Sequence, residues 1–390
     1  MKWKFYSLAF VAGMSILTAC SSDDNNDNDG NGGNGNGNEI ENGTILKGTI
    51  TSDVTLAAGN TYKLSGEYIV EEGATLHIEE GVKIIAVYDD IADYILVKQG
   101  GKINAVGTPD KPIVMTSEKE EPGAWGGIHI CGRAHTNAEG GKGSSEIGGA
   151  VYGGNDDADN SGTLQYIRLE YTGFAFDEEH EANGISFYGV GNGTIVDHCQ
   201  AYKGSDDGFE FFGGSGNVSN LVAVSCSDDS FDWTEGWNGK GTNLVAYQED
   251  KSTLGYDCDC LMECDNNGSN NAATPVAHPV LKNLILVGNG GSKQGIRLRA
   301  GTEVEIDNAK VCGKGQPLTV ETALTENALK NGTSKLTNIT LTSELSSKEG
   351  IYTHADFIAV TSNKVDANLS YSSFEDIRKE CSWMNGSWVK

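Results

Sequence analysis

The 390-residue chain carries 55 Asp and Glu side chains against 28 Lys and Arg, for a formal net charge of −27 at pH 7. This excess of negative charge argues against nucleic acid and anionic lipid head groups as partners, and it favours divalent cations. The 52 glycines and 6 prolines favour a fold with many tight corners, because glycine readily adopts positive φ.

The N-terminal segment has the pattern of a secretory signal. Lys2 and Lys4 precede a short apolar run that ends in Leu17-Thr18-Ala19-Cys20, and this run is too short to span a membrane comfortably. The last four residues resemble the lipobox of bacterial lipoproteins. The resemblance implies a signal peptide over residues 1–19 and acyl chains on Cys20 that anchor the protein to a membrane. An ordinary signal peptide with a chance cysteine is the alternative.

Residues 20–39 are expected to form a flexible tether, because Ser21 to Glu39 includes no apolar residue that could be buried. Ser-Ser-Asp-Asp after Cys20 resembles the acidic export tag of Bacteroidetes surface lipoproteins, which implies a lipid-anchored, surface-exposed location in the outer membrane. No second linker of this kind follows, so residues 40–390 are predicted to form a single domain.

An acidic and aromatic phrase recurs after 22 residues, first as GSDDGFEFFGG (204–214) and then as CSDDSFDWTEG (226–236). Around it, longer and shorter strand patterns alternate between Gly, Asn and Asp turns. The longer patterns are LQYIRLEY (164–171), IVDHCQAY (195–202), VSNLVAVS (218–225), TNLVAYQ (242–248), LKNLILVG (281–288) and VEIDNAKV (304–311). The shorter patterns are GIHICG (127–132), GISFYG (184–189), GFEFFG (208–213), SFDWTEG (230–236), LMEC (261–264) and GIRLRAG (295–301).

The spacing of equivalent strands, about 22–24 residues, is typical of one coil of a parallel β-helix. We therefore predict an all-β, right-handed parallel β-helix with a small C-terminal cap. Residues 322–329 are expected to form a short helix within that cap.

The phrases YIVEEGATLHIEEGVKI, GGKINAVGTPDKPIVMTS, WGGIHICG and SDDGFEFFGG together resemble a family of Bacteroidetes surface proteins. The resemblance covers nearly the whole mature chain, including Trp383 to Trp388. It implies a parallel β-helix, often carried by a lipoprotein, and says almost nothing about chemistry.

Stacked coils place equivalent side chains about 4.8 Å apart. The shorter strands then give an outward column and, one residue earlier, an inward apolar stack. The outward column consists of His129, Ser186, Glu210, Asp232, Glu263 and Arg297, and the inward stack of Ile128, Ile185, Phe209, Phe231, Met262 and Ile296.

The stacked carboxylates would repel one another unless a cation or a basic side chain lies between them. Ca²⁺ suits such a group, because it takes six to eight oxygen ligands. The predicted Ca²⁺ ligands are Asp206, Asp207, Asp228, Asp229, Asp232 and Glu263. The alternative is that the paired aspartates only cap turns through backbone N–H groups.

A second acidic cluster, with alternating spacing but without an EF-hand frame, consists of Asp257, Asp259, Glu263, Asp265 and Asn266. Cys258, Cys260 and Cys264 lie within this segment, but no fourth zinc ligand completes them. Eight cysteines remain after Cys20, an even number that permits disulfides in an exported protein. Cys258 and Cys264 are the expected local pair.

Two enzymatic hypotheses use the same acidic column. Asp-Asp-Gly-Phe-Glu is similar to a phrase in some Ca²⁺-dependent pectate lyases, and this implies Ca²⁺ on a uronate carboxylate with a basic side chain that removes the C5 proton. Arg297, Arg299 and Lys203 are the candidates for that base. Alternatively, Glu210 and Asp232 could act as acid and nucleophile in glycoside hydrolysis. His129 and His198 are expected to be structural.

The binding hypothesis assigns glycan contact to an exposed aromatic cluster of Trp233, Trp237 and Tyr247, because aromatic rings stack on sugar faces. The sequence thus predicts a cell-surface lipoprotein that binds Ca²⁺ and presents an extended face to a glycan or an outer-membrane protein. A Ca²⁺-dependent polysaccharide lyase or glycoside hydrolase acting on acidic glycans is the alternative.

Overall fold

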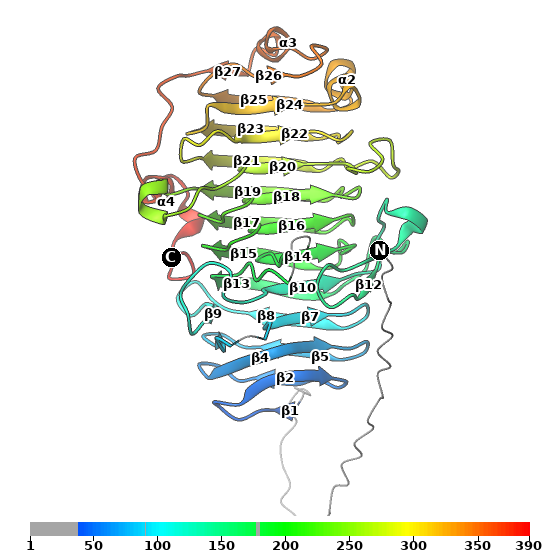
Figure 1. Cartoon of the computed structure of the whole chain (residues 1–390), viewed down its shortest axis with the longest axis vertical. Coiled ribbons are helices and arrows are strands. Elements are labelled where there is room, and N and C mark those ends of the chain that lie inside the picture. Colours follow the sequence, from blue (N-terminus) through cyan, green and yellow to red (C-terminus); the bar gives the residue numbers. More distant parts are fainter. Residues whose placement is uncertain (1–37, 90, 177–179) are drawn as a thin grey trace, which may run out of the picture. The chain divides into compact units, whose positions relative to one another are not determined.

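The computed structural model describes residues 38–89, 91–176 and 180–390. The predicted signal peptide, Cys20 and nearly all of the predicted tether lie outside these residues. The described chain belongs to one compact unit, Asn36–Lys390, in which parallel strands stack coil upon coil (Figure 1). The predicted right-handed parallel β-helix is confirmed. Within the described residues, no helix has the length and apolarity needed to cross a membrane.

Short strands form one sheet, in which each strand pairs in parallel with the short strand of the next coil. We call it the short-strand sheet. It consists of β7 (Tyr94–Val97), β10 (Ile128–Cys131), β14 (Ile185–Tyr188), β16 (Phe209–Phe212), β18 (Phe231–Thr234), β20 (Met262–Cys264), β22 (Gln294–Leu298), β24 (Gln316–Val320) and β26 (Ser346–Ser347).

Longer strands form the rest of the coil wall and also pair in parallel from coil to coil. These long strands are β13 (Gly162–Glu170), β15 (Ile195–Tyr202), β17 (Asn217–Val224), β19 (Lys240–Tyr247), β21 (Val280–Val287), β23 (Glu305–Cys312), β25 (Lys335–Leu341) and the short final member β27 (Lys364–Val365). The first coils are built from β1 (Asn38–Glu39), β2 (Ile45–Ile50), β3 (Val54–Leu56), β4 (Thr61–Val70), β5 (Thr75–Ile78), β6 (Lys83–Ala86), β8 (Lys102–Val106) and β9 (Ile113–Ser117).

Each coil has a third face because the long strands bend at one residue. β13 pairs with β8 before Tyr166 and with β9 after it, and Tyr166 has φ 52°. Later coils place asparagine at this bend, a residue that tolerates positive φ. The Asn243 amide donates to Asn220 at 2.8 Å, and the Asn283 amide donates to Asn243 at 3.0 Å. This ladder holds one corner of the stack.

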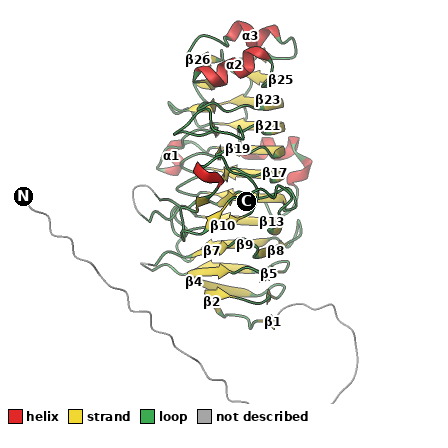
Figure 2. Cartoon of the chain, turned by 90° about the vertical axis from the view of Figure 1, so that its right-hand side faces the viewer, coloured by secondary structure: helices red, strands yellow, loops and turns green. Residues whose placement is uncertain are grey.

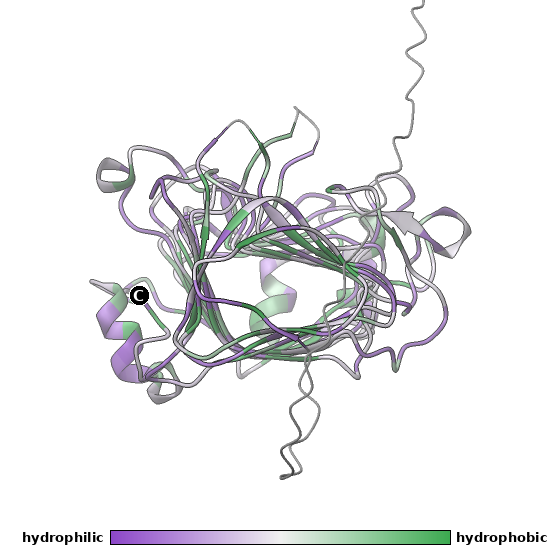
Figure 3. Cartoon of the chain, turned by 90° about the horizontal axis from the view of Figure 1, so that it is seen from below, coloured by the Kyte–Doolittle hydropathy of each residue, from purple (hydrophilic) through white to green (hydrophobic). Residues whose placement is uncertain are grey.

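Buried apolar side chains fill the interior of the coils. Figure 3 looks along the stack, so that the coils are seen to surround this interior. All six residues of the predicted inward stack are at most 1% exposed. The rings of Phe209 and Phe231 lie parallel within 13°, with centroids 5.6 Å apart. The alternation of the short strands therefore sends the neighbouring outward column to the opposite side of the sheet.

The C-terminal region does more than cap the stack. Helices α2 (Ala323–Asn331) and α3 (His354–Ala359) cover one end of the coils (Figure 2), and Leu329 and Phe357 enter the apolar core there. The predicted short helix is thus present. The remaining helical segments are α1 (Lys251–Leu254), α4 (Phe374–Glu380), η1 (Glu139–Gly141) and η2 (Ser382–Met384), and a hairpin joins β11 (Gly143–Ser144) to β12 (Val151–Tyr152).

Residues 374–390 return along the long strands and form what we call the C-terminal strap. Trp388 is fully buried and packs edge-on against Tyr166 and His198, with ring centroids 6.1 and 5.2 Å apart. Lys390 donates its backbone N–H to Gln200 at 2.8 Å. The strap therefore fastens the end of the chain to coils in the middle of the stack.

Trp388→Ala should lower the free energy of unfolding by about 3–5 kcal/mol, because it removes a large buried side chain. Urea unfolding monitored by circular dichroism measures this loss. Trp383→Ala is the control, because Trp383 is only partly buried, and it should cost clearly less. Equal losses for the two variants would contradict the anchoring role of Trp388.

Candidate functional site

The predicted outward column is present on the short-strand sheet. The register pairs His129 with Ser186 and Ser186 with Glu210. It then pairs Glu210 with Asp232, Asp232 with Glu263, and Glu263 with Arg297. Residues far apart in the sequence, such as Glu263 and Arg297, are therefore direct neighbours on one face.

The turn before each short strand adds an aspartate with a partly structural role. Asp207 accepts the backbone N–H of Asp229 at 2.8 Å, and Asp229 accepts that of Cys260 at 2.6 Å. Turn capping, the alternative function of these aspartates, thus occupies one oxygen of each. Their second carboxylate oxygens remain available for a ligand.

Column and turn carboxylates meet in two overlapping triads. The first triad is Asp207, Glu210 and Asp232, and the second is Asp229, Asp232 and Glu263. In each triad, one ligand atom from every member lies within 4.8 Å of the others. Asp232 belongs to both triads, so the repeat builds the same arrangement twice.

The remaining predicted ligands form a third group with a shared member. Asp206 and Asp228 lie with Asp207, again with ligand atoms within 4.8 Å of one another. Asp206 is buried, whereas Asp228 is exposed to solvent. All six predicted Ca²⁺ ligands therefore lie close together on the short-strand sheet and the turns before it. We call this group of six carboxylates the ledge. No single ion could contact all of them.

Arginine side chains bond directly to one end of this ledge. Arg297 donates to Glu263 at 2.8 Å and to Glu321 at 3.3 Å. Arg299 forms an ion pair with Glu263 and donates to Asp265 at 2.7 Å. The second triad is therefore partly compensated through Glu263.

In the described part of the chain, no basic side chain bonds to a member of the first triad. Within the described residues, its only side-chain donor is the Asn183 amide, which lies 2.6 Å from Glu210. Asp232 accepts no hydrogen bond from the described residues, and its Oδ1 is buried. The buried oxygens Asn183 Oδ1 and Ser230 Oγ are likewise without a partner. Such unpaired buried oxygens are costly unless a cation or water binds them.

The electrostatics of the ledge follow from this arrangement. Burial raises the pKa of Asp207, Glu210, Asp229 and Asp232 well above their usual values, and repulsion among these carboxylates raises it further. Burial and the nearby Asp228 raise the pKa of Asp206 to about 7. The carboxylates must therefore hold protons or bind a cation near neutral pH. Carboxylate and amide oxygens are the ligands that Ca²⁺ prefers, so the residues fit this ion.

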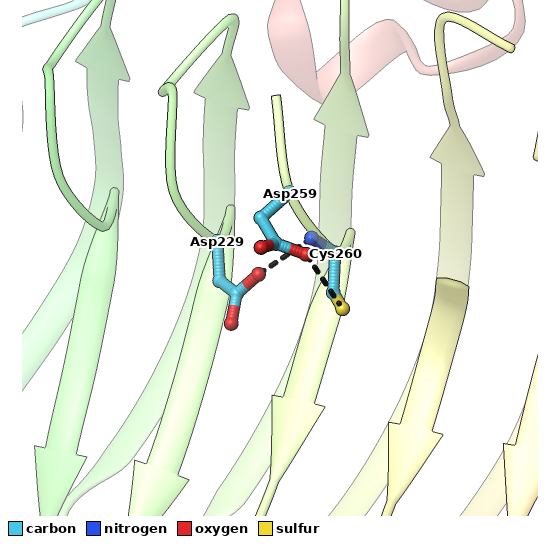
Figure 4. A group of neighbouring side chains, drawn as sticks. All are labelled: Asp229, Asp259 and Cys260. Carbon is cyan, nitrogen blue, oxygen red and sulfur yellow. Dashed lines mark hydrogen bonds between the residues drawn. The ribbon is translucent and has the colours of Figure 1, made fainter. Parts of the chain in front are cut away.

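The second predicted acidic cluster does not form one site. Asp257 bonds to Lys251 at 2.7 Å, and Asp265 faces Arg299. Asn266 holds neighbouring loops through Asn137. Asp259 lies instead beside Asp229 and Cys260 (Figure 4).

The predicted Cys258–Cys264 disulfide is wrong, because both cysteines are free. Cys264 pairs in register with Trp233 and points into the apolar core, whereas Cys258 lies in the preceding turn. Cys258, Cys260 and Cys264 do not converge in any group that could hold a metal within the described residues.

The predicted exposed aromatic cluster is also wrong. Trp233 and Trp237 are 1% and 2% exposed, and Trp237 stacks on Phe211 with centroids 4.2 Å apart. Tyr247 packs beneath α4 against Phe374. Because Asp232 points outward, strand alternation already requires Trp233 to point inward. Trp233 and Trp237 therefore pack in the core and do not form an exposed sugar-stacking surface.

Of the three basic side chains proposed as the catalytic base, two lie beside the carboxylate triads and one does not. Arg297 and Arg299 adjoin the second triad, whereas Lys203 is bound to Glu249 at 2.8 Å. His129 is fully buried, and burial lowers its pKa to about 4, so it is neutral. His198 lies 2.8 Å from Asp197 and stacks on Tyr166. Both histidines have the structural environment that the sequence predicts.

The structure also contains a polar cleft that sequence reasoning missed. It has a volume of about 730 Å³ and opens beside the C-terminal end of β18. Its lining comes from three separate segments, namely Asn137–Glu139, Thr234–Glu235 and Asn267–Asn270. Two of these segments are loops outside the 22-residue repeat, so their meeting leaves no periodic signal in the sequence.

The raised carboxyl pKa values predict a distinctive pH dependence in chelator. A carboxyl with a higher pKa in the folded chain binds its proton more tightly there, so its contribution to stability is present at low pH. For Asp206 this contribution is lost between about pH 4 and about pH 7, at up to about 1.4 kcal/mol per pH unit. Asp206→Asn should therefore reduce the fall in melting temperature between pH 5 and pH 8.

The matched control is Asp110→Asn, at an exposed position far along the chain from the ledge. This variant should keep the wild-type pH dependence. An unchanged pH dependence in Asp206→Asn would show that Asp206 is ionised in the folded protein throughout this range.

No curated protein matches the chain. Among solved structures, the Dettilon tailspike protein is similar at a TM-score of 0.33 and 8% sequence identity, over 76% of this chain and 56% of that chain. The match thus spans little more than half of the tailspike chain. Residues 48–389 match the family described as pectate-lyase-like beta helix domain. With its stacked parallel coils and its match over most of its length, the chain belongs to the pectate-lyase-like beta helix family.

Proposed function

We propose that this protein is a lipid-anchored, surface-exposed protein of the outer membrane whose β-helix binds Ca²⁺ and contacts a glycan or an envelope protein. The lipobox-like residues that end at Cys20 support the anchor, and the acidic segment after them supports surface exposure. The observation that carries the Ca²⁺ proposal is Asp232, a shared member of two carboxylate triads whose buried Oδ1 has no partner among the described residues.

The first triad is the favoured Ca²⁺ site. Asp207, Glu210 and Asp232 offer three carboxylates with no basic side chain bonded to them in the described chain, whereas Glu263 of the second triad is paired with two arginines. A divalent cation would relieve the repulsion that raises the pKa of these groups. Since the coils on either side supply the ligands, Ca²⁺ would also stabilise the stack.

The glycan part of the proposal rests on the family and on the outer face. The family description refers to pectate lyases, and this supports a carbohydrate-related function. On the short-strand sheet, successive coils contribute a row of partly exposed charged side chains, namely Glu210, Asp232, Glu263 and Arg297. Such a surface offers many hydrogen-bonding groups to a long ligand.

The lyase alternative has a specific observation in its favour, because Arg297 and Arg299 lie next to carboxylates that could hold Ca²⁺. However, an arginine base must lose a proton, and the adjoining carboxylates raise the pKa of both side chains. Hydrolysis by Glu210 and Asp232 needs one protonated and one ionised carboxyl. Burial raises the pKa of both, so the structure provides no clear division between acid and nucleophile.

Asp232→Asn should weaken Ca²⁺ binding by at least about tenfold, because it removes a charged ligand from the first triad. Isothermal titration calorimetry of the chelator-treated protein measures this change. The same variant should melt at an equal or higher temperature than the wild type in chelator, since one repelling charge is lost. Wild-type protein, but not the variant, should gain stability when Ca²⁺ is added.

Asp110→Asn is again the control and should bind Ca²⁺ as the wild type does. If the wild type shows neither heat of binding nor a rise in melting temperature with Ca²⁺, the cation proposal fails. The paired aspartates would then act only as turn caps.

The enzymatic alternative is decided by incubation with uronate polymers and Ca²⁺. We expect no rise in the absorbance of unsaturated uronate products, because both arginines are held in ion pairs. A rise that is abolished by Arg297→Ala, with Ca²⁺ affinity retained, would establish the lyase instead.

A further inference from the structure

The polar cleft lies on the same outer face as the carboxylate triads. Thr234 follows Asp232 by two residues on β18, so its side chain points to the same side about 7 Å farther along the strand. The other walls come from the loops at Asn137–Glu139 and Asn267–Asn270. The cleft and the cation ledge are therefore adjacent but do not share a lining residue.

Buried hydrogen bonds hold the walls of the cleft in place. The Asn137 amide donates to Asn266 Oδ1 at 2.8 Å and to the carbonyl of Pro275 at 3.0 Å. Asn267 in turn donates to Asn137 Oδ1 at 3.0 Å. The two loops are thus fixed to each other, and a ligand would meet a preformed site with little ordering cost.

Glu235 is fixed in the same way. Its Oε2 accepts the hydroxyls of Thr136 at 2.7 Å and Tyr152 at 2.8 Å. Its Oε1 accepts no hydrogen bond from the described residues and remains available as an acceptor. A positioned carboxylate of this kind can receive hydrogen bonds from two neighbouring hydroxyls of a ligand.

The cleft combines free donors with free acceptors. Three donor groups in the lining make no hydrogen bond to any described residue. They are the Thr234 hydroxyl, the Ser269 hydroxyl and the Asn270 amide nitrogen. Glu139 and Glu235 supply acceptors. Sugar hydroxyls are both donors and acceptors, so they match this mixture.

The charge of the cleft selects among saccharides. Its lining includes two carboxylates and no basic side chain, and the neighbouring ledge is also acidic. A uronate would be repelled at this position, and its carboxylate would lack a charged partner on entering the cleft. An uncharged sugar avoids both costs.

We propose that the cleft lined by Thr234, Glu235 and Asn270 binds an uncharged, hydroxyl-rich saccharide. This inference rests on the glycan-binding part of the proposed function and adds the location and the chemical class of the ligand. It does not require the Ca²⁺ site, because the lining residues of the cleft are not members of the triads.

The test is calorimetric titration of the purified lipidated protein in detergent. The probes are neutral oligosaccharides (mannose, xylose and glucose oligomers), oligogalacturonate, and glucosamine oligomers. We expect binding of at least one neutral series and no binding of oligogalacturonate. Thr234→Val should weaken the neutral interaction about three- to tenfold, the effect of losing one hydrogen bond.

Asn270→Asp should weaken it further, because it replaces a free donor with an acceptor while keeping the oxygen that accepts the N–H of Ala272. Thr242→Val on β19 is the control, because Thr242 does not line the cleft, and it should bind like the wild type. Every variant should keep the wild-type circular dichroism spectrum and melting temperature, which shows that each variant is folded.

Tighter binding of oligogalacturonate or of glucosamine oligomers than of every neutral probe would overturn the proposal. If the protein binds Ca²⁺ but none of the saccharides, the proposal for the cleft is wrong and the proposal for the cation site stands. Equal neutral binding by the wild type and Thr234→Val would place the saccharide elsewhere on the protein.

Discussion

The parallel register between successive coils is the constraint on which the rest of the structure depends. It places each short strand directly on the equivalent strand of the previous coil, with side chains about 4.8 Å apart. Inside the coil this spacing stacks apolar rings, such as Phe209 on Phe231. Outside, the same spacing stacks Glu210 on Asp232. The geometry that favours the core therefore forces carboxylates together on the surface.

The carboxylates of the ledge repel one another, and basic side chains compensate this repulsion unevenly along the stack. At one end, Arg297 and Arg299 pair with Glu263 and relieve the repulsion directly. In the middle, Glu210 and Asp232 lack a basic partner in the described chain. Replacing them with apolar residues would remove the electrostatic cost without disturbing the coils. The proposed cation would relieve this repulsion where no basic side chain does.

Periodicity determined which parts of this structure could be predicted from sequence. The coil length, the outward column and the inward stack all follow from a 22-residue repeat, and the structure contains all three. The predicted exposure of Trp233 is wrong because it follows from the chemistry of aromatic rings alone, whereas strand alternation after Asp232 requires an inward side chain. The Cys258–Cys264 pair was inferred from local spacing, which does not report that Cys264 faces the core. The cleft depends on loop contacts between residues 130 positions apart, such as Asn137 with Asn267, and these leave no periodic signal.

The C-terminal strap changes how cooperatively the stack can unfold. In a simple solenoid each coil contacts only its neighbours, so terminal coils fray without affecting the centre. Here Ser387 bonds to Pro109 at 2.8 Å and Lys390 bonds to Gln200, which links the end of the chain to distant coils. Loss of the strap would expose the apolar surface formed by Val222, Val245 and their neighbours. We therefore expect the last coil and the long strands of the central coils to unfold together in one cooperative transition.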